Sequence, residues 1–207
     1  MTGVPRRWFL ATRPDVLGLL QEQMRITDEC IASFARWSAD GATQDATQVR
    51  EGEHVGDRAR RALVAGLQAV LATPLDQEDL YTISDRLDAV QDLAKNIVRL
   101  AQETAWAPDV HAERMAEAAG ASVGRLVTAC AALPADLDGA GRAADEAIKA
   151  ARAVEKRHRV ALVELTRSDR APTGLVLAAD FYRRYGALGD AIVGVSHRVW
   201  YAVLKQG

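Results

Sequence analysis

The chain has 207 residues, of which 49% are hydrophobic and 26% charged, and its formal net charge is −2. This composition excludes an intrinsically disordered chain and is that of a globular protein with one large domain or two small ones. The near balance of acidic and basic residues provides no strong positive field, so we expect no nucleic-acid partner.

Six segments show helical periodicity, and none alternates as a β-strand would. In chain order they cover about residues 15–38, 48–71, 76–104, 109–132, 140–166 and 174–205. Turn-forming stretches separate them: SADGATQD, TPLDQED, AWAPD, LPADLDG and SDRAPTG. Asp76 is placed to cap the third helix, with Glu78 and Asp79 in its first turn.

Six long helices with short connections predict an all-α fold in which successive helices are antiparallel. Three helices followed by three more suggest two copies of a three-helix unit, residues 1–106 and 107–207. The matching positions are Glu53 and Asp57 with Glu155 and Arg159, and Asp85, Asp88 and Asp92 with Asp190, Val193 and His197.

The two cysteines, Cys30 and Cys130, lie far apart and have no CxxC partner. They are therefore predicted to be buried thiols of a reducing compartment. The N-terminal stretch MTGVPRRWFLATRPD lacks the apolar core of a signal peptide, and no run of apolar residues is long enough to span a membrane. We expect a cytoplasmic protein.

Two neighbouring helices each carry a ladder of carboxylates. The stretch DRLDAVQD places Asp85, Asp88 and Asp92 at i, i+3 and i+7, which stacks them on one helical face. The opposite, apolar face consists of Ile83, Leu87, Val90, Ala94 and Ile97. On the preceding helix Glu53 and Asp57 are one turn apart. The residues predicted to point away from them are Val55, Ala59, Ala62 and Leu63. If the two helices are antiparallel neighbours, both ladders converge on one strip of surface.

Two interpretations of these ladders stay open. Acidic residues opposite an apolar stripe are what a solvated helical face looks like, and nearby arginines can neutralise them in surface ion pairs. The arginines in question are Arg58, Arg60, Arg61 and Arg86. Alternatively, several carboxylate oxygens on one surface can bind a hard or borderline cation. His54 points about 100° away from Glu53, which is less suited to a ligand than to a surface residue.

At these residues the sequence resembles the PhoU-like family, particularly the short accessory proteins of low-affinity Pit-type phosphate transporters. The matching pieces are EHVGD at 53–57 and TPLDQEDLYTISDRLDAVQD at 73–92, with LLQEQ at 19–23 and the six-helix layout in agreement. The resemblance implies two tandem antiparallel three-helix bundles that carry E/D-x-x-x-D motifs on the second and third helix of each.

The resemblance also implies a metal site and a function. Iron or zinc would bind at Glu53, Asp57, Asp85, Asp88 and Asp92 in the first half. The second half departs from the pattern because Arg159, Val193 and Gly194 replace expected carboxylates and His197 replaces an aspartate. One metal site at most is therefore expected. The implied function is non-enzymatic regulation of inorganic phosphate uptake, with recruitment to the membrane only through a Pit-type transporter partner.

The residues themselves show no sign of phosphate recognition, since there is neither a glycine-rich phosphate loop nor an arginine cluster at a helix start. Motifs of hydrolases and zinc proteases are also absent from the sequence. A di-iron carboxylate enzyme is the best enzymatic alternative, but such sites use Glu-x-x-His ligands inside a bundle.

A metal-free helical scaffold that binds a partner is the other alternative. The last helix is rich in aromatic residues: Phe181, Tyr182, Tyr185, Trp200 and Tyr201. We expect it to be central to the second bundle, although part of it can dock a transporter helix or a second subunit of a homo-oligomer. Trp8, Phe9 and Leu10, which follow Arg6 and Arg7, can similarly touch a membrane surface.

Overall fold

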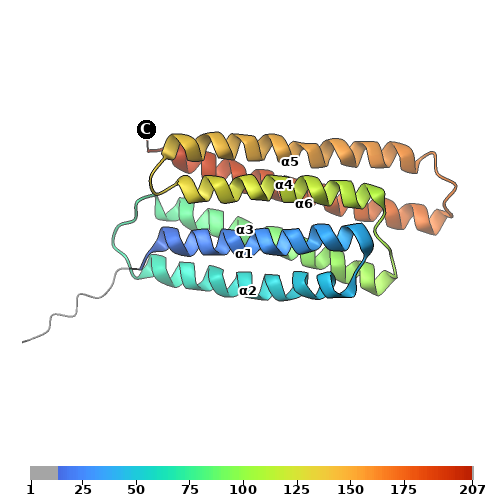
Figure 1. Cartoon of the computed structure of the whole chain (residues 1–207), viewed down its shortest axis with the longest axis horizontal. Coiled ribbons are helices and arrows are strands. Elements are labelled where there is room, and N and C mark those ends of the chain that lie inside the picture. Colours follow the sequence, from blue (N-terminus) through green and yellow to red (C-terminus); the bar gives the residue numbers. More distant parts are fainter. Residues whose placement is uncertain (1–13, 207) are drawn as a thin grey trace, which may run out of the picture.

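The computed structural model describes residues 14–206, and this part of the chain contains six α-helices and no strand, as predicted. The helices lie side by side along the long axis of the molecule (Figure 1). They are α1 (Val16–Asp40), α2 (Thr43–Gln68), α3 (Gln77–Thr104), α4 (Val110–Ala132), α5 (Leu137–Leu165) and α6 (Pro172–Leu204).

Aspartate side chains begin four of these helices. Asp15, Asp76, Asp109 and Asp136 each accept hydrogen bonds from backbone N–H groups in the first turn of the helix that follows. These bonds satisfy donors that have no partner within the helix. The predicted cap at Asp76 is confirmed, since its carboxylate accepts from the N–H of Glu78 at 2.8 Å.

The largest difference from the predicted boundaries is at the start of α2, which begins at Thr43 and not near residue 48. Gly41 ends α1 in the left-handed conformation, with φ of 70°, and its N–H donates to the Trp37 carbonyl. Glycine adopts this conformation without steric cost. Asp40 then accepts from the Ala42 N–H at 2.8 Å, so the turn is complete within two residues.

The helices form two antiparallel three-helix bundles, α1–α3 and α4–α6, packed side by side. Contacts of α1 with α4 and of α3 with α6 join the bundles, whereas α2 and α5 lie on the outer sides (Figure 1). One continuous hydrophobic core runs through both bundles. The predicted division at residues 106 and 107 falls in the connection between α3 and α4.

A buried charge cluster joins the bundles at one end of the α3–α6 contact. The Asp79 side chain is fully buried, and its carboxylate lies 2.6 Å from Arg198 Nη2 and 3.0 Å from Lys205 Nζ. A buried carboxylate without a cation is costly. Arg198 of α6 and Lys205, the residue that follows α6, therefore stabilise the burial of this α3 residue, which the sequence analysis placed only in the first turn.

The aromatic residues of α6 separate into two groups. Phe181, Tyr182 and Tyr185 are fully buried, which confirms that this part of α6 is central to its bundle. Trp200 and Tyr201 are 43% and 46% exposed near the other end of the helix. The predicted membrane contact of Trp8, Phe9 and Leu10 lies outside the described residues.

Both cysteines are buried and free, as predicted. Burial raises the pKa of each thiol to about 12, so neither is a reactive thiolate at neutral pH. None of the helices in residues 14–206 is both long and apolar enough to cross a membrane.

The close packing of α5 on α6 depends on Gly189. A Cβ at this position would lie 2.8 Å from Val154 Cβ, and the branched, buried valine cannot move aside. We expect Gly189→Ala to lower the free energy of unfolding by about 1–3 kcal/mol through overpacking. The measurement is urea denaturation followed by circular dichroism.

Gly120→Ala is the matched control, because a Cβ there meets no atom within 4 Å. Because alanine has a higher helix propensity than glycine, this variant should have a free energy of unfolding up to about 1 kcal/mol higher. Equal changes in the two variants would contradict the packing explanation.

Candidate metal-binding site on helices α2 and α3

The site is built on a fixed antiparallel contact between α2 and α3. The buried Gln91 amide of α3 donates to the Gly52 carbonyl of α2 at 3.2 Å. Gly56 leaves the space for this side chain, because a Cβ there would lie 2.0 Å from Gln91 Oε1. This contact sets which residues of the two helices face each other.

The inner face of α2 differs from the prediction. Its buried residues are Ala46, Val49, Glu53, Gly56, Leu63, Gly66 and Leu67. Glu53 therefore occupies a core-type position and is only 9% exposed. Val55, which was predicted to point inward, is 36% exposed, and Ala62 is exposed as well. Glu53 is buried because α3 covers it, which the local pattern of α2 cannot reveal.

The apolar face predicted for α3 is confirmed, since Ile83, Leu87, Val90, Ala94 and Ile97 are all buried. The aspartates opposite this face reach solvent: the side chains of Asp85 and Asp92 are about half exposed, at 52% and 48%. The Asp88 side chain, between them, is 23% exposed.

The five predicted ligands line one seam between the two helices, which we call the carboxylate strip: Glu53, Asp57, Asp85, Asp88 and Asp92. Its members interact, because Asp92, Asp57 and Glu53 all act electrostatically on Asp88. The structure therefore brings together residues of α2 and α3 that the sequence analysis assigned to one surface.

Basic side chains contact the strip at both ends. Lys95 Nζ lies 2.7 Å from Glu53 Oε1 and 2.9 Å from Asp92 Oδ1. Arg60 Nη2 donates to Asp85 Oδ1 at 2.7 Å. Burial by itself would lower the pKa of Lys95, but the contacts with Glu53 and Asp92 outweigh this and raise it. Lys95 therefore stays an ammonium ion at neutral pH.

The other arginines near the strip behave differently from one another. Arg61 pairs with Asp57 one turn away. Arg86 turns to the other bundle and donates to the Gly194 carbonyl of α6. Arg58 has no ion pair within residues 14–206, so only Arg60 and Arg61 of the four candidate arginines neutralise the strip.

Asp88 has the most strained electrostatic position of the strip. Burial, and then the negative charges of Asp92, Asp57 and Glu53, raise its pKa, while Arg60 opposes them. The Arg60 Nε atom is 3.9 Å from Asp88 Oδ2, too far for a hydrogen bond. An additional cation near Asp88 would relieve this repulsion.

Carboxylate oxygens are suitable ligands for a hard or borderline cation, and one of them, Glu53 Oε2, is buried without a hydrogen-bond donor in the described part of the chain. Glu53 Oε2 accepts no hydrogen bond within the described residues, although His54 Nδ1 is 2.9 Å away in an unfavourable direction. In residues 14–206, however, no three His, Cys, Asp or Glu side chains come together as a formed metal-binding group. The carboxylates instead turn toward Lys95, Arg60 and Arg61, so a metal would have to displace these contacts.

The equivalent positions of the second half form no such strip. Glu155 pairs with Arg159 on the exposed side of α5. Asp190 and His197 are exposed on α6, and Arg86 of α3 contacts the backbone at Gly194. This arrangement agrees with the departure of the second half from the expected motif.

Sequence reasoning did not identify Lys95 and Gln91. Lys95 follows Asp92 by three residues, so that pair was visible in the sequence. Its contact with Glu53 depends on the register of α3 against α2, as does the hydrogen bond of Gln91. Neither residue carries a local signal of this register.

The fold of this chain is similar to that of known structures, although its sequence matches no known family model. No protein-family model and no curated protein matches the sequence. Among solved structures, a PhoU-like protein from Shewanella oneidensis MR-1 is similar with a TM-score of 0.78 and 18% identity, over 91% of this chain and 99% of that one. A second structure from the same organism, described as a PhoU-like phosphate regulatory protein, has a TM-score of 0.76 and 18% identity, over 92% and 100%.

The raised pKa of Asp88 leads to a pH-dependent prediction. The folded state holds the Asp88 proton more tightly than the unfolded state, so ionisation removes stability as the pH rises from about 4 through the folded-state pKa. We expect Asp88→Asn to raise the Tm at pH 7 and to have little effect near pH 3, where both states are protonated. Thermal denaturation at the two pH values measures this.

Asp85→Asn serves as the control because it removes the 2.7 Å hydrogen bond to Arg60. Its Tm at pH 7 should fall slightly, as expected for a surface ion pair worth about 0.2–1 kcal/mol. A lower Tm at pH 7 for both variants would show that Asp88 is not electrostatically destabilising.

Proposed function

We propose that the chain is a non-enzymatic, cytoplasmic regulator of phosphate homeostasis whose carboxylate strip binds iron or zinc. The observation that supports this most is the shared fold: the similarity extends over nearly the whole of both chains to a protein described as PhoU-like and phosphate regulatory. The strip lies on the two helices where the resemblance of the sequence is most specific, at residues 53–57 and 73–92.

The residues that would hold the metal are the five of the strip: Glu53, Asp57, Asp85, Asp88 and Asp92. Bound metal would supply positive charge where Asp88 is now repelled by its neighbours. It would also contact Glu53 Oε2, which accepts no hydrogen bond within the described residues. The half-exposed positions of Asp85 and Asp92 favour a surface cation over the enclosed di-iron centre of a bundle enzyme.

One observation favours a second candidate, a metal-free scaffold with the same fold. Lys95 already bridges Glu53 and Asp92, Arg60 contacts Asp85 and Arg61 pairs with Asp57, so three resident cations partly neutralise the strip. In this candidate the strip is a structural ion-pair network between α2 and α3, and partner binding alone carries the function.

Metal content distinguishes the two candidates. Protein purified without an affinity tag or chelator should contain stoichiometric iron or zinc by mass spectrometry. Glu53→Gln should abolish it, because this change removes a buried ligand charge without changing the shape of the side chain. Glu51→Gln, on an exposed face of the same helix, is the matched control and should keep the metal.

The absence of metal from wild-type protein, even after reconstitution with iron and with zinc, would select the metal-free scaffold. Loss of metal in both variants would show that general surface charge, and not the strip, holds the cation.

The proposed partner is a Pit-type phosphate transporter, and the exposed end of α6 is the candidate contact. Trp200, Tyr201 and Leu204 are 43%, 46% and 59% exposed there. Arg198 and Lys205 lie over the Tyr201 ring at 5.5 and 5.6 Å, which leaves Trp200 as the aromatic residue without such a cation. Exposed aromatic residues of this kind are common anchors of interfaces, either with a transporter or with a second copy in a homo-oligomer.

Co-purification with the Pit-type transporter of the same cell tests this partner. We expect Trp200→Ala to reduce the captured transporter by about tenfold, the usual loss for an aromatic anchor. Val163→Ala, at an exposed apolar site on α5, should have little effect. Failure of the wild-type protein to capture the transporter would contradict the partner assignment.

A further inference from the structure

A groove lies between α4 and α5, in the bundle that lacks the carboxylate strip. It has a volume of about 380 Å³ and is lined by His111, Arg114, Ala153, Lys156, Arg157 and Val160. The four residues from α5 stand at i, i+3, i+4 and i+7, so they form one stripe along the groove. Volumes of about 300–1,000 Å³ are typical of small-molecule sites.

The groove concentrates positive charge that the protein itself does not neutralise. Arg114, Lys156 and Arg157 have no carboxylate within 4 Å in residues 14–206. Arg157 Nη1 donates to the Arg114 carbonyl at 2.7 Å, which fixes its guanidinium group across the groove. The acidic residue that does contact the lining is Glu164, whose Oε2 lies 3.3 Å from His111 Nε2 at one end.

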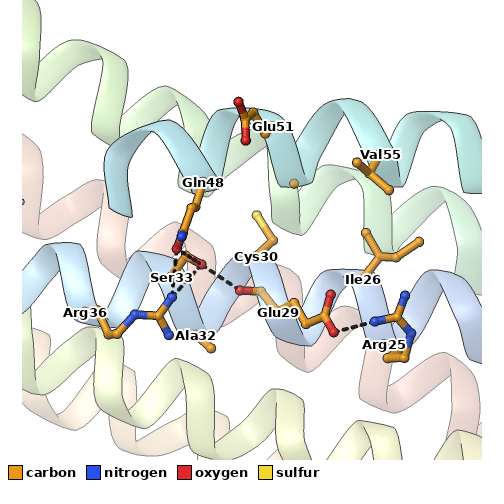
Figure 2. Close-up of a pocket in the computed structure, with 11 residues that line it drawn as sticks. Arg25, Ile26, Glu29, Cys30, Ala32, Ser33, Arg36, Gln48, Glu51 and Val55 are labelled. Atoms are coloured by element: carbon orange, nitrogen blue, oxygen red, sulfur yellow. Dashed lines mark hydrogen bonds and ion pairs between the residues drawn. The ribbon is translucent and has the colours of Figure 1, made fainter. Parts of the chain in front are cut away.

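The corresponding groove of the first bundle, between α1 and α2, is different. It has a similar volume of about 420 Å³ and also contains two arginines, Arg25 and Arg36 (Figure 2). Arg25 pairs with Glu22 and with Glu29, and Arg36 lies 2.9 Å from Asp45. The cations of this groove are thus neutralised within the chain, unlike Arg114, Lys156 and Arg157 of the α4–α5 groove.

The residue types in the α4–α5 groove match phosphate groups. Guanidinium groups donate pairs of hydrogen bonds to phosphate oxygens, and an ammonium group adds a point charge. Three cations in one groove repel one another, and a ligand with a single negative charge would leave most of that repulsion in place. Val160, which is 44% exposed, and Ala153 provide an apolar wall beside them.

We propose that the α4–α5 groove binds a small molecule that carries a diphosphate group, with Arg114, Lys156 and Arg157 as the phosphate ligands. The volume and the apolar wall provide room for an organic substituent next to the diphosphate. This site shares no residue with the carboxylate strip, so it stands independently of metal binding there.

Isothermal titration of the protein with inorganic pyrophosphate and with ADP, at about 50 mM ionic strength where screening is weak, tests the proposal. Both ligands should bind, since both carry the diphosphate. Lys156→Gln and Arg114→Gln should each weaken binding by about tenfold, the loss expected for one charge-assisted contact.

Lys149→Gln is the matched control. Lys149 is on the same helix as Lys156 and pairs with Asp145. Its replacement removes the same charge from outside the groove, so ligand binding should weaken by less than about twofold. Repeating the titration with Glu53→Gln separates binding in the groove from removal of metal at the strip, because the heat of groove binding should persist in that variant.

Three results would overturn the proposal. They are the absence of binding by wild-type protein at millimolar ligand, equal weakening by Lys149→Gln and Lys156→Gln, and binding of orthophosphate or sulfate as tight as that of pyrophosphate. The second would indicate diffuse attraction to net charge, and the third a site that does not distinguish a diphosphate. Circular dichroism of each variant confirms that the helices are intact.

Discussion

The register of α2 against α3 is the constraint on which the candidate site depends. Gly56 leaves room for the Gln91 side chain between the helices, and the Gly52 carbonyl accepts a hydrogen bond from its amide. A Cβ at position 56 would lie 2.0 Å from Gln91 Oε1, so a larger residue there would displace this side chain and disturb its hydrogen bond to Gly52. The contact of Lys95 with Glu53 exists because this register places the two side chains opposite each other.

The fold and part of the site could be predicted from local patterns, whereas the rest depends on tertiary contacts. In α3 the apolar spacing from Ile83 to Ile97 identifies the buried face directly, because every position follows the helical period. In α2 the same reasoning places Val55 inside and Glu53 outside, and the structure has the reverse. A charged residue at a core-type position breaks the pattern, and only the neighbouring helix explains it.

The two bundles share a helix order but distribute their charge in opposite ways. In the first, α2 and α3 gather carboxylates along one seam, and resident cations compensate only part of them. In the second, the matching positions retain two carboxylates, Glu155 paired with Arg159 and the exposed Asp190, and α4 and α5 gather cations in a groove. The grouping of these cations was not predicted because Arg114 and Lys156 are brought together by helix packing and not by spacing in the sequence.

The buried Asp79 cluster has a consequence for how the molecule opens and unfolds. Its carboxylate belongs to one bundle and its cations to the other, so moving α6 away from α3 would break both ion pairs and expose the buried Asp79 to water. Backbone amides of α3 and α6 near this cluster should therefore exchange with solvent in a common opening event. These ion pairs therefore couple the opening of the two bundles.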